Sequence, residues 1–198
     1  MESQLIILAS ASPRRQELLS SAGISYEVLP SEVDEGFQEG EAPEEYVVRL
    51  ARRKAEKAGE RHKDRWVLAA DTVVVIDGRI LGKPGGRQEA REMLGMLSDQ
   101  EHRVITGFCL SRGDSGKSRE GAVTTRVRFK NLSSREIDWY LDTGEPFDKA
   151  GAYAIQGKAA FMVKEIRGSY TNVVGLPLTE VIEALQEMGI EWDADKHG

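Results

Sequence analysis

Residues 67–81, VLAADTVVVIDGRIL, decide the fold class of this 198-residue chain. Two apolar runs, 67–70 and 73–76, predict strands, and they flank the polar pair Asp71-Thr72. Asp77-Gly78 then predicts a tight turn into a short strand at 79–81. The centre of the chain therefore contains an antiparallel hairpin with one acid between its apolar runs.

Strand and helix signals alternate on both sides of this segment. Before it we expect strands at 5–9 and 26–29, a helix at 13–22 with Ser12 as N-cap, and a helix opened by Pro43. After it we expect a helix near 90–97, strands at 104–110 and 123–129, a helix from the capping box of Ser133 and Glu136 to about Asp142, strands near Tyr153 and at 161–166, and a last helix from about Pro177. Hairpins mixed with strand–helix units predict an α/β fold with a mixed sheet.

The composition is that of a globular chain and excludes several classes of function. Lys and Arg total 27 against 33 Asp and Glu, so the formal net charge is −6, which argues against a long nucleic acid as the main partner. The single cysteine, Cys109, excludes an internal disulfide and a multi-cysteine zinc site. The apolar runs are too short for a membrane helix or a signal peptide, so we expect a cytoplasmic protein.

The first candidate site is Ser10-Ala-Ser-Pro-Arg14-Arg15, where a buried strand passes into a helix. Free N–H groups at a helix N-terminus attract anions, whereas two arginines in that turn are unfavourable unless an anion compensates them. A pair of solvated side chains is the alternative. The serines favour a phosphate.

The second candidate is Asp71, because a buried carboxylate needs a partner. It could be a metal ligand or a general base, or merely a strand-end acid that caps a turn. Glu32, Asp34 and Glu35 could share a divalent cation with it, and a solvated acidic loop is the alternative.

Two loops add further candidates. Lys83, between Gly82 and Pro84, could reach a phosphate. In 144–157, two glycines would let the backbone approach a ligand, and Gln156 offers both a donor and an acceptor to a base. A plain surface loop is the alternative for both.

Other motifs are interpreted as structural. Residues 113–118 resemble the end of a P-loop but lack the leading glycine, so we predict a hairpin turn. His62, His102 and His197 lack metal-ligand spacing and are expected on the surface, whereas Cys109 is expected to be a buried structural thiol.

Taken together, several stretches resemble the Maf family of nucleotide pyrophosphatases. They span nearly the whole chain, and they are SASPRRQELL at 10–19, YVVRLA at 46–51 with Lys54-Ala55, ADTVV at 70–74, GKP at 82–84, DKAGAYAIQG at 148–157 and NVVGLPL at 172–178. The resemblance implies one Maf-like domain over 1–198, without a separable linker. It implies a mixed, twisted sheet with flanking helices and two lobes around a substrate cleft.

The resemblance also implies hydrolysis of a nucleoside triphosphate to the monophosphate and pyrophosphate, with Mg²⁺ or Mn²⁺. Asp71 would accept the proton of the attacking water and bind metal with Glu35. Ser10, Arg15, Lys54 and Lys83 would bind the substrate phosphates.

The implied substrates are dTTP and UTP, possibly with modified pyrimidine nucleotides among them. Arg14, Thr72 and Gln156 match the family branch with Arg, Thr and Gln at these positions, whereas a branch acting on 7-methyl-GTP carries Trp and Glu. The family is associated with nucleotide-pool cleaning and with arrest of septum formation. A nucleotide-binding regulator of cell division with little turnover is the alternative, and a homodimer is left open.

Overall fold

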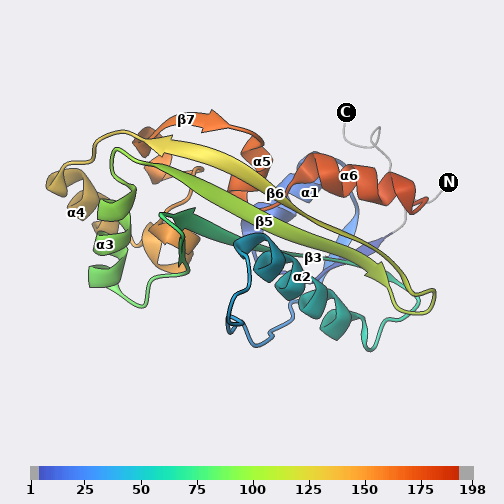
Figure 1. Ribbon diagram of the computed structural model, residues 1–198. Helices are drawn as coiled ribbons and strands as arrows, with labels where there is room; N and C mark the ends of the chain where they lie inside the picture. The colour runs from blue at the N-terminus through green and yellow to red at the C-terminus, as the bar shows by residue number, and fades with distance from the viewer. Residues whose placement is uncertain (1–4, 192–198) are drawn as a thin grey trace. The chain divides into compact units, whose positions relative to one another are not determined.

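The computed structural model describes residues 5–191, and its strands form one mixed seven-stranded sheet. The strand order is β2-β1-β3-β5-β6-β7, with β4 paired to β3 (Figure 1). The strands are β1 (Ile6–Leu8), β2 (Tyr26–Val28), β3 (Trp66–Ile76), β4 (Arg79–Leu81), β5 (Glu101–Arg112), β6 (Lys117–Phe129) and β7 (Val163–Arg167). The β1 strand is parallel to β2 and β3, whereas β3–β4 and β6–β7 are antiparallel, so the predicted mixed α/β sheet is confirmed.

Six α-helices and three short 3₁₀ segments complete the described part of the chain. The helices are α1 (Pro13–Ser21), α2 (Pro43–Gly59), α3 (Arg87–Leu97), α4 (Ser134–Asp142), α5 (Tyr170–Val174) and α6 (Leu178–Glu187), and the 3₁₀ segments are η1 (Glu145–Asp148), η2 (Ala150–Ala152) and η3 (Lys158–Met162). None of these helices is long and apolar enough to cross a membrane.

The chain divides into two compact units. The first comprises 5–71, 106–123 and 175–191 of the described residues, and the second comprises Thr72–Ile105 and Thr124–Val174. Strands β3, β5 and β6 each contain residues of both units.

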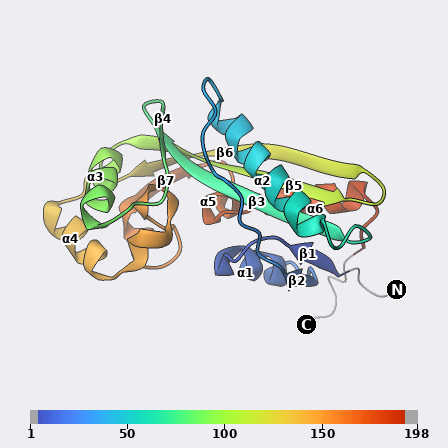
Figure 2. The ribbon, with the colours of Figure 1, turned by 90° about the horizontal axis from the view of Figure 1, so that it is seen from below.

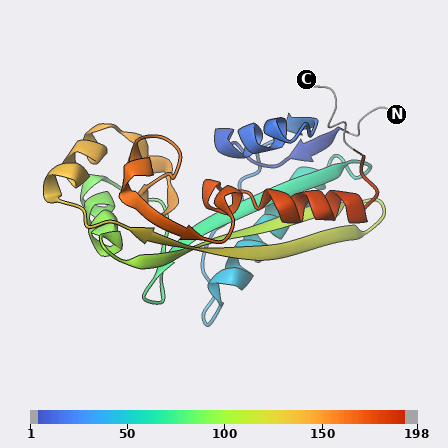
Figure 3. The same ribbon diagram turned by 90° about the horizontal axis from the view of Figure 1, so that it is seen from above.

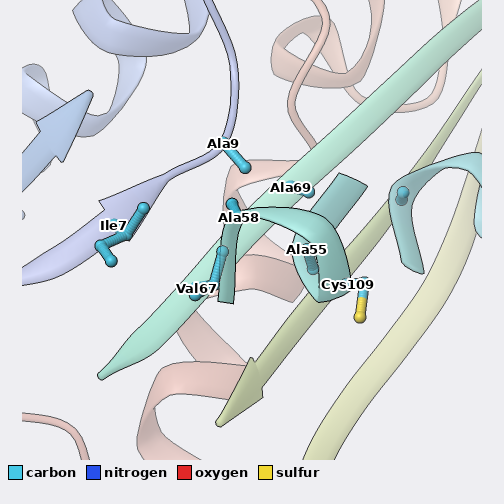
Figure 4. Close-up of a cluster of buried hydrophobic side chains, with 8 residues drawn as sticks. Ile7, Ala9, Ala55, Ala58, Val67, Ala69 and Cys109 are labelled. Atoms are coloured by element: carbon cyan, nitrogen blue, oxygen red, sulfur yellow. The ribbon is translucent and has the colours of Figure 1, made fainter. Parts of the chain in front are cut away.

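The first unit is built on close packing of α2 against the sheet. Figures 2 and 3 view the chain from opposite sides and show α2 on one face of the long strands and α6 on the other. Small side chains form much of the α2 contact: Ala51, Ala55 and Ala58 pack with Ile7, Ala9, Val67, Ala69 and Cys109 (Figure 4). Cys109 is 1% exposed, and burial raises its pKa to about 12, which confirms the predicted buried thiol.

The second unit buries an aromatic cluster. His102 Nε2 lies 2.8 Å from Tyr153 Oη, and both rings lie edge-on to Phe129. The predicted surface position of His102 is therefore wrong, because the residue is only 2% exposed. Polar residues flank His102 in the sequence, but its position in β5 points it into this unit. His62 is half-buried, and His197 lies outside the described residues.

One prediction about strands is confirmed and another is wrong. Residues 67–70 and 73–76 are strand as predicted, and they form one continuous strand, β3, because Asp71 has a partner that makes a polar residue tolerable inside it. The strand expected near Tyr153 is replaced by η2 and η3, since Gly151 and Ala152 have positive φ values of 66° and 60° that no strand accommodates.

Turns and caps agree better with the sequence. The turn at Asp77-Gly78 has positive φ at both residues, as the hairpin signal predicts. Ser133 and Glu136 form the predicted capping box of α4. Ser12 is the N-cap of α1, although its side chain makes no capping hydrogen bond. Residues 113–116 form the predicted turn between β5 and β6.

Candidate active site

Asp71 and Glu35 converge on one ammonium group. Lys54 extends from α2, and its Nζ donates to Asp71 Oδ1 at 2.6 Å and to Glu35 Oε1 at 2.7 Å. The side chains of Lys54 and Asp71 are 12% and 14% exposed, whereas that of Glu35 is 55% exposed. Lys54 therefore compensates the half-buried acid of β3 and links it to the acidic loop before α2.

Arg15 is fixed at the start of α1 by two acceptors. Its Nε donates to the main-chain carbonyl of Gly175 at 2.7 Å, and its Nη1 donates to Ser10 Oγ at 3.0 Å. Burial lowers the pKa of the Arg15 guanidinium from its usual value, and the Asp71 carboxylate opposes this effect. Arg15 is thus held by acceptors of the protein, and the Asp71 carboxylate that pairs with Lys54 also acts on its charge. Arg14 is half-buried in the same turn, and its charge also lowers the pKa of Arg15.

Ser10 ends the buried β1 region and is 8% exposed. Its Oγ accepts from the main-chain N–H of Ser12 at 3.3 Å in addition to Arg15. The first unit therefore brings together five of the predicted site residues: Ser10, Arg15, Glu35, Lys54 and Asp71.

The other predicted site residues belong to the second unit. Thr72 follows Asp71 in β3 and is half-buried, Lys83 is exposed after β4, and Gln156 is half-buried between η2 and η3. The two loops that carry Lys83 and Gln156 are connected, because the N–H of Gly151 donates to the carbonyl of Gly82 at 3.0 Å.

The glycines of the 144–157 loop serve the protein's own packing. A Cβ on Gly151 would lie 2.8 Å from the side chain of Val74, and a Cβ on Gly157 would lie 3.0 Å from the Glu145 carboxylate. Both glycines therefore lie close to side chains of the protein itself, one in β3 and one in η1.

Sequence reasoning missed the side chains of α2 that bind the acidic loop. Tyr46 Oη donates to the main-chain carbonyl of Glu35 at 2.8 Å, and Arg49 donates to that of Gly36 at 3.0 Å. Tyr46 and Arg49 lie within a matching motif, but nothing in their spacing indicates that their partners are carbonyl groups ten or more residues earlier.

Two carboxylates could hold a divalent cation here. Within residues 5–191 no group of three or more His, Cys, Asp or Glu side chains is arranged as a metal site. Magnesium, however, commonly takes one or two protein carboxylates and completes its shell with water and phosphate oxygens. Asp71 and Glu35 meet that requirement, since both already converge on the single cation Lys54.

The fold is shared with proteins of distant sequence. A HAM1 protein from Coxiella burnetii aligns with a TM-score of 0.53 at 17% identity, over 93% of this chain and 99% of that one. The Ham1 protein of Staphylococcus aureus aligns with a TM-score of 0.50 at 16% identity, over 94% and 100% of the two chains. At such identities the likeness describes the fold alone.

The family follows from the sequence comparison. The model of the Maf-like protein family matches residues 5–188, and the chain belongs to the Maf family. A dTTP/UTP pyrophosphatase of Syntrophus aciditrophicus is 52% identical over 198 residues, covering 100% of this chain and 97% of the relative. A dTTP/UTP pyrophosphatase of Geotalea uraniireducens is 56% identical over 188 residues, covering 93% and 95%.

Proposed function

We propose that this chain hydrolyses dTTP and UTP to the nucleoside monophosphate and pyrophosphate. The observation that carries the proposal is its identity of 52–56% with dTTP/UTP pyrophosphatases over nearly the full length of both chains. The geometry at Asp71 agrees, because this half-buried carboxylate pairs with Lys54 and its charge also acts on the Arg15 guanidinium. Such a site joins a proton acceptor to cations that bind phosphate.

Asp71 is the proton acceptor in this proposal. As the water oxygen bonds to the α-phosphorus, the bond from that phosphorus to the α–β bridging oxygen breaks and pyrophosphate leaves. Asp71 takes the proton that the water loses. Lys54 Nζ, 2.6 Å from Oδ1, holds the carboxylate in place, so that its other oxygen can serve as the base.

Cationic side chains bind the triphosphate. Lys54 pairs with Asp71 in the first unit, where Ser10 accepts from Arg15 and orients it. Lys83 is assigned the same role from its exposed loop in the second unit. Fixed positive charges stabilise the negative charge that develops on the leaving pyrophosphate.

Glu35 and Asp71 would hold the divalent cation, Mg²⁺ or Mn²⁺. When bound, the cation neutralises charge on the phosphate oxygens and polarises the α-phosphate. Glu35 suits this role because its side chain is more than half exposed and can meet a cation that arrives with the nucleotide.

Base choice is assigned to Arg14, Thr72 and Gln156. An amide can donate to a carbonyl of uracil or thymine and accept from N3–H, whereas a cationic 7-methylguanine is disfavoured next to an arginine. One Maf-like domain with two lobes around a substrate cleft belongs to this proposal.

A panel of nucleotides tests the proposal. The chain is assayed for pyrophosphate release from UTP, dTTP and 7-methyl-GTP with Mg²⁺ or Mn²⁺. We expect kcat/KM for the two pyrimidine nucleotides to exceed that for 7-methyl-GTP by about tenfold or more, as one mismatched buried hydrogen bond produces. Asp71→Asn is the control for contaminating enzymes and should lose ~10²–10⁴ in kcat. Preference for the methylated purine, or absence of pyrophosphate, would contradict the proposal.

A further inference from the structure

The acidic segment 32–36 is attached to α2 through its main-chain carbonyl groups. Four side chains of α2 each donate to one of these carbonyls: Lys57 to Glu32, Arg53 to Asp34 at 2.9 Å, Tyr46 to Glu35 at 2.8 Å, and Arg49 to Gly36 at 3.0 Å. In the opposite direction, Ser31 Oγ donates to the main-chain carbonyl of Lys54 at 2.8 Å.

The four donors lie on one face of α2. Positions 46, 49, 53 and 57 are separated by three, four and four residues, which is the spacing of a single helical stripe. The acceptors follow in roughly the reverse order along the chain. The acidic segment therefore runs antiparallel to the helix along this stripe.

Hydrogen bonds to the carbonyl groups hold the backbone of the segment and do not use the Glu35 carboxylate. The segment belongs to no helix or strand, so its carbonyls have no partners within regular secondary structure. Because Tyr46 binds the main chain of Glu35, the side chain of Glu35 remains able to meet Lys54 Nζ. Tyr46 therefore holds the backbone of Glu35, whereas Lys54 contacts its carboxylate.

The residues that follow the acidic segment make two more contacts with the same helix. Arg49 makes a bidentate ion pair with Glu41, at 2.5 and 2.7 Å. The Phe37 ring stacks on Tyr46, with the ring centroids 4.0 Å apart and an interplanar angle of 16°. Both contacts restrict the chain directly after Glu35.

The Tyr46 hydroxyl is the donor in its contact with the acidic segment. A main-chain carbonyl oxygen can only accept, so the hydroxyl proton is directed at the Glu35 carbonyl.

We infer that Tyr46 is a positioning residue that holds Glu35 beside Asp71 for the binding of a divalent cation. Its consequence for turnover rests on the proposed function, whereas its effect on the loop and on cation binding does not. Tyr46→Phe is the sharpest variant, because it removes one hydroxyl and keeps the ring that stacks on Phe37.

Two measurements without nucleotide test this inference. Hydrogen exchange reports the opening of the loop at the amides of Gly36 and Gln38, which donate to the carboxylates of Asp34 and Glu41. Electron paramagnetic resonance of free Mn²⁺ reports the affinity of the chain for that ion. The matched control is Tyr26→Phe, which also removes a tyrosine hydroxyl that donates to a main-chain carbonyl, that of Gln16 at 3.1 Å, away from the acidic loop.

We expect Tyr46→Phe to speed exchange of these amides and to weaken Mn²⁺ binding, each by roughly fivefold, the effect of one lost hydrogen bond. Tyr26→Phe should leave both values at those of the unaltered chain. Unchanged exchange in Tyr46→Phe, or a Mn²⁺ affinity equal to that of the unaltered chain, would overturn the inference. A chain that hydrolyses no nucleotide would contradict the proposed function but would leave both measurements valid.

Discussion

At the scale of single residues, burial of a polar group is tolerated here where a partner replaces water. Asp71 has Lys54, and Ser10 has Arg15. His102 is satisfied on one side only: its Nε2 meets Tyr153 Oη, but its Nδ1 has no hydrogen-bond partner among residues 5–191. Burial accordingly lowers the pKa of His102 from 6.5 to about 4.

His102 predicts a loss of stability in mild acid. In the unfolded chain the imidazole takes a proton below about pH 6.5, whereas in the folded chain it does so only near pH 4. Its contribution to the free energy of unfolding is therefore complete above pH 6.5 and is lost as the pH falls towards 4, by up to about 3 kcal/mol. Urea unfolding of the unaltered chain and of His102→Gln, compared at pH 7.5, 5.5 and 4.5, measures this. The free-energy difference between them should shrink in acid, and a pH-independent difference would refute the role of His102.

At the scale of elements, α2 approaches the sheet at a point where no side chain fits. A Cβ on Gly107 of β5 would lie 2.4 Å from the main-chain carbon of Val47 and 2.6 Å from its oxygen. The alanines on α2 continue this close packing along the helix. Gly107 therefore sets the distance between β5 and α2, the helix that carries Lys54 and Tyr46.

Gly107→Ala should therefore destabilise the protein by about 2–3 kcal/mol. The added Cβ would meet backbone atoms of α2, which cannot rotate away as a side chain could. The matched control is Gly95→Ala in α3, where no atom lies within 4 Å of the added Cβ. That change should be neutral or stabilising by up to about 1 kcal/mol, since alanine favours the helix. Urea midpoints followed by circular dichroism compare the two. Equal midpoints would show that α2 can move away from β5 without cost.

Elements with a strong local signal could be predicted from the sequence. Helix α2 has apolar residues at helical spacing, the 77–78 turn has the residues that positive φ requires, and α4 has its capping box. The 3₁₀ segment η2 was missed because Ala152 adopts a positive φ that its residue type does not indicate. The full lengths of β5 and β6 were also missed, because polar residues at their ends pair in the sheet without a hydrophobic pattern.

At the scale of the whole molecule, motifs select candidate site residues but do not predict their contacts. Lys54 and Asp71 are 17 residues apart on a helix and a strand, and no sequence spacing predicts that their charged atoms meet at 2.6 Å. The attachment of Glu35 by Tyr46 depends on a main-chain carbonyl, which every residue has. The sequence could therefore predict Asp71, Lys54 and Arg15 as candidate site residues, whereas the contacts of Lys54 and Arg15 are seen only in the folded chain.

In the proposed reaction water attacks the α-phosphorus, and the fate of isotopic oxygen tests this step most directly. UTP is hydrolysed by the unaltered chain in water enriched in oxygen-18, and the products are separated and weighed by mass spectrometry. Attack at the α-phosphorus predicts one labelled oxygen in the uridine monophosphate and none in the pyrophosphate. Label found in the pyrophosphate, or release of single phosphate ions in its place, would contradict the account.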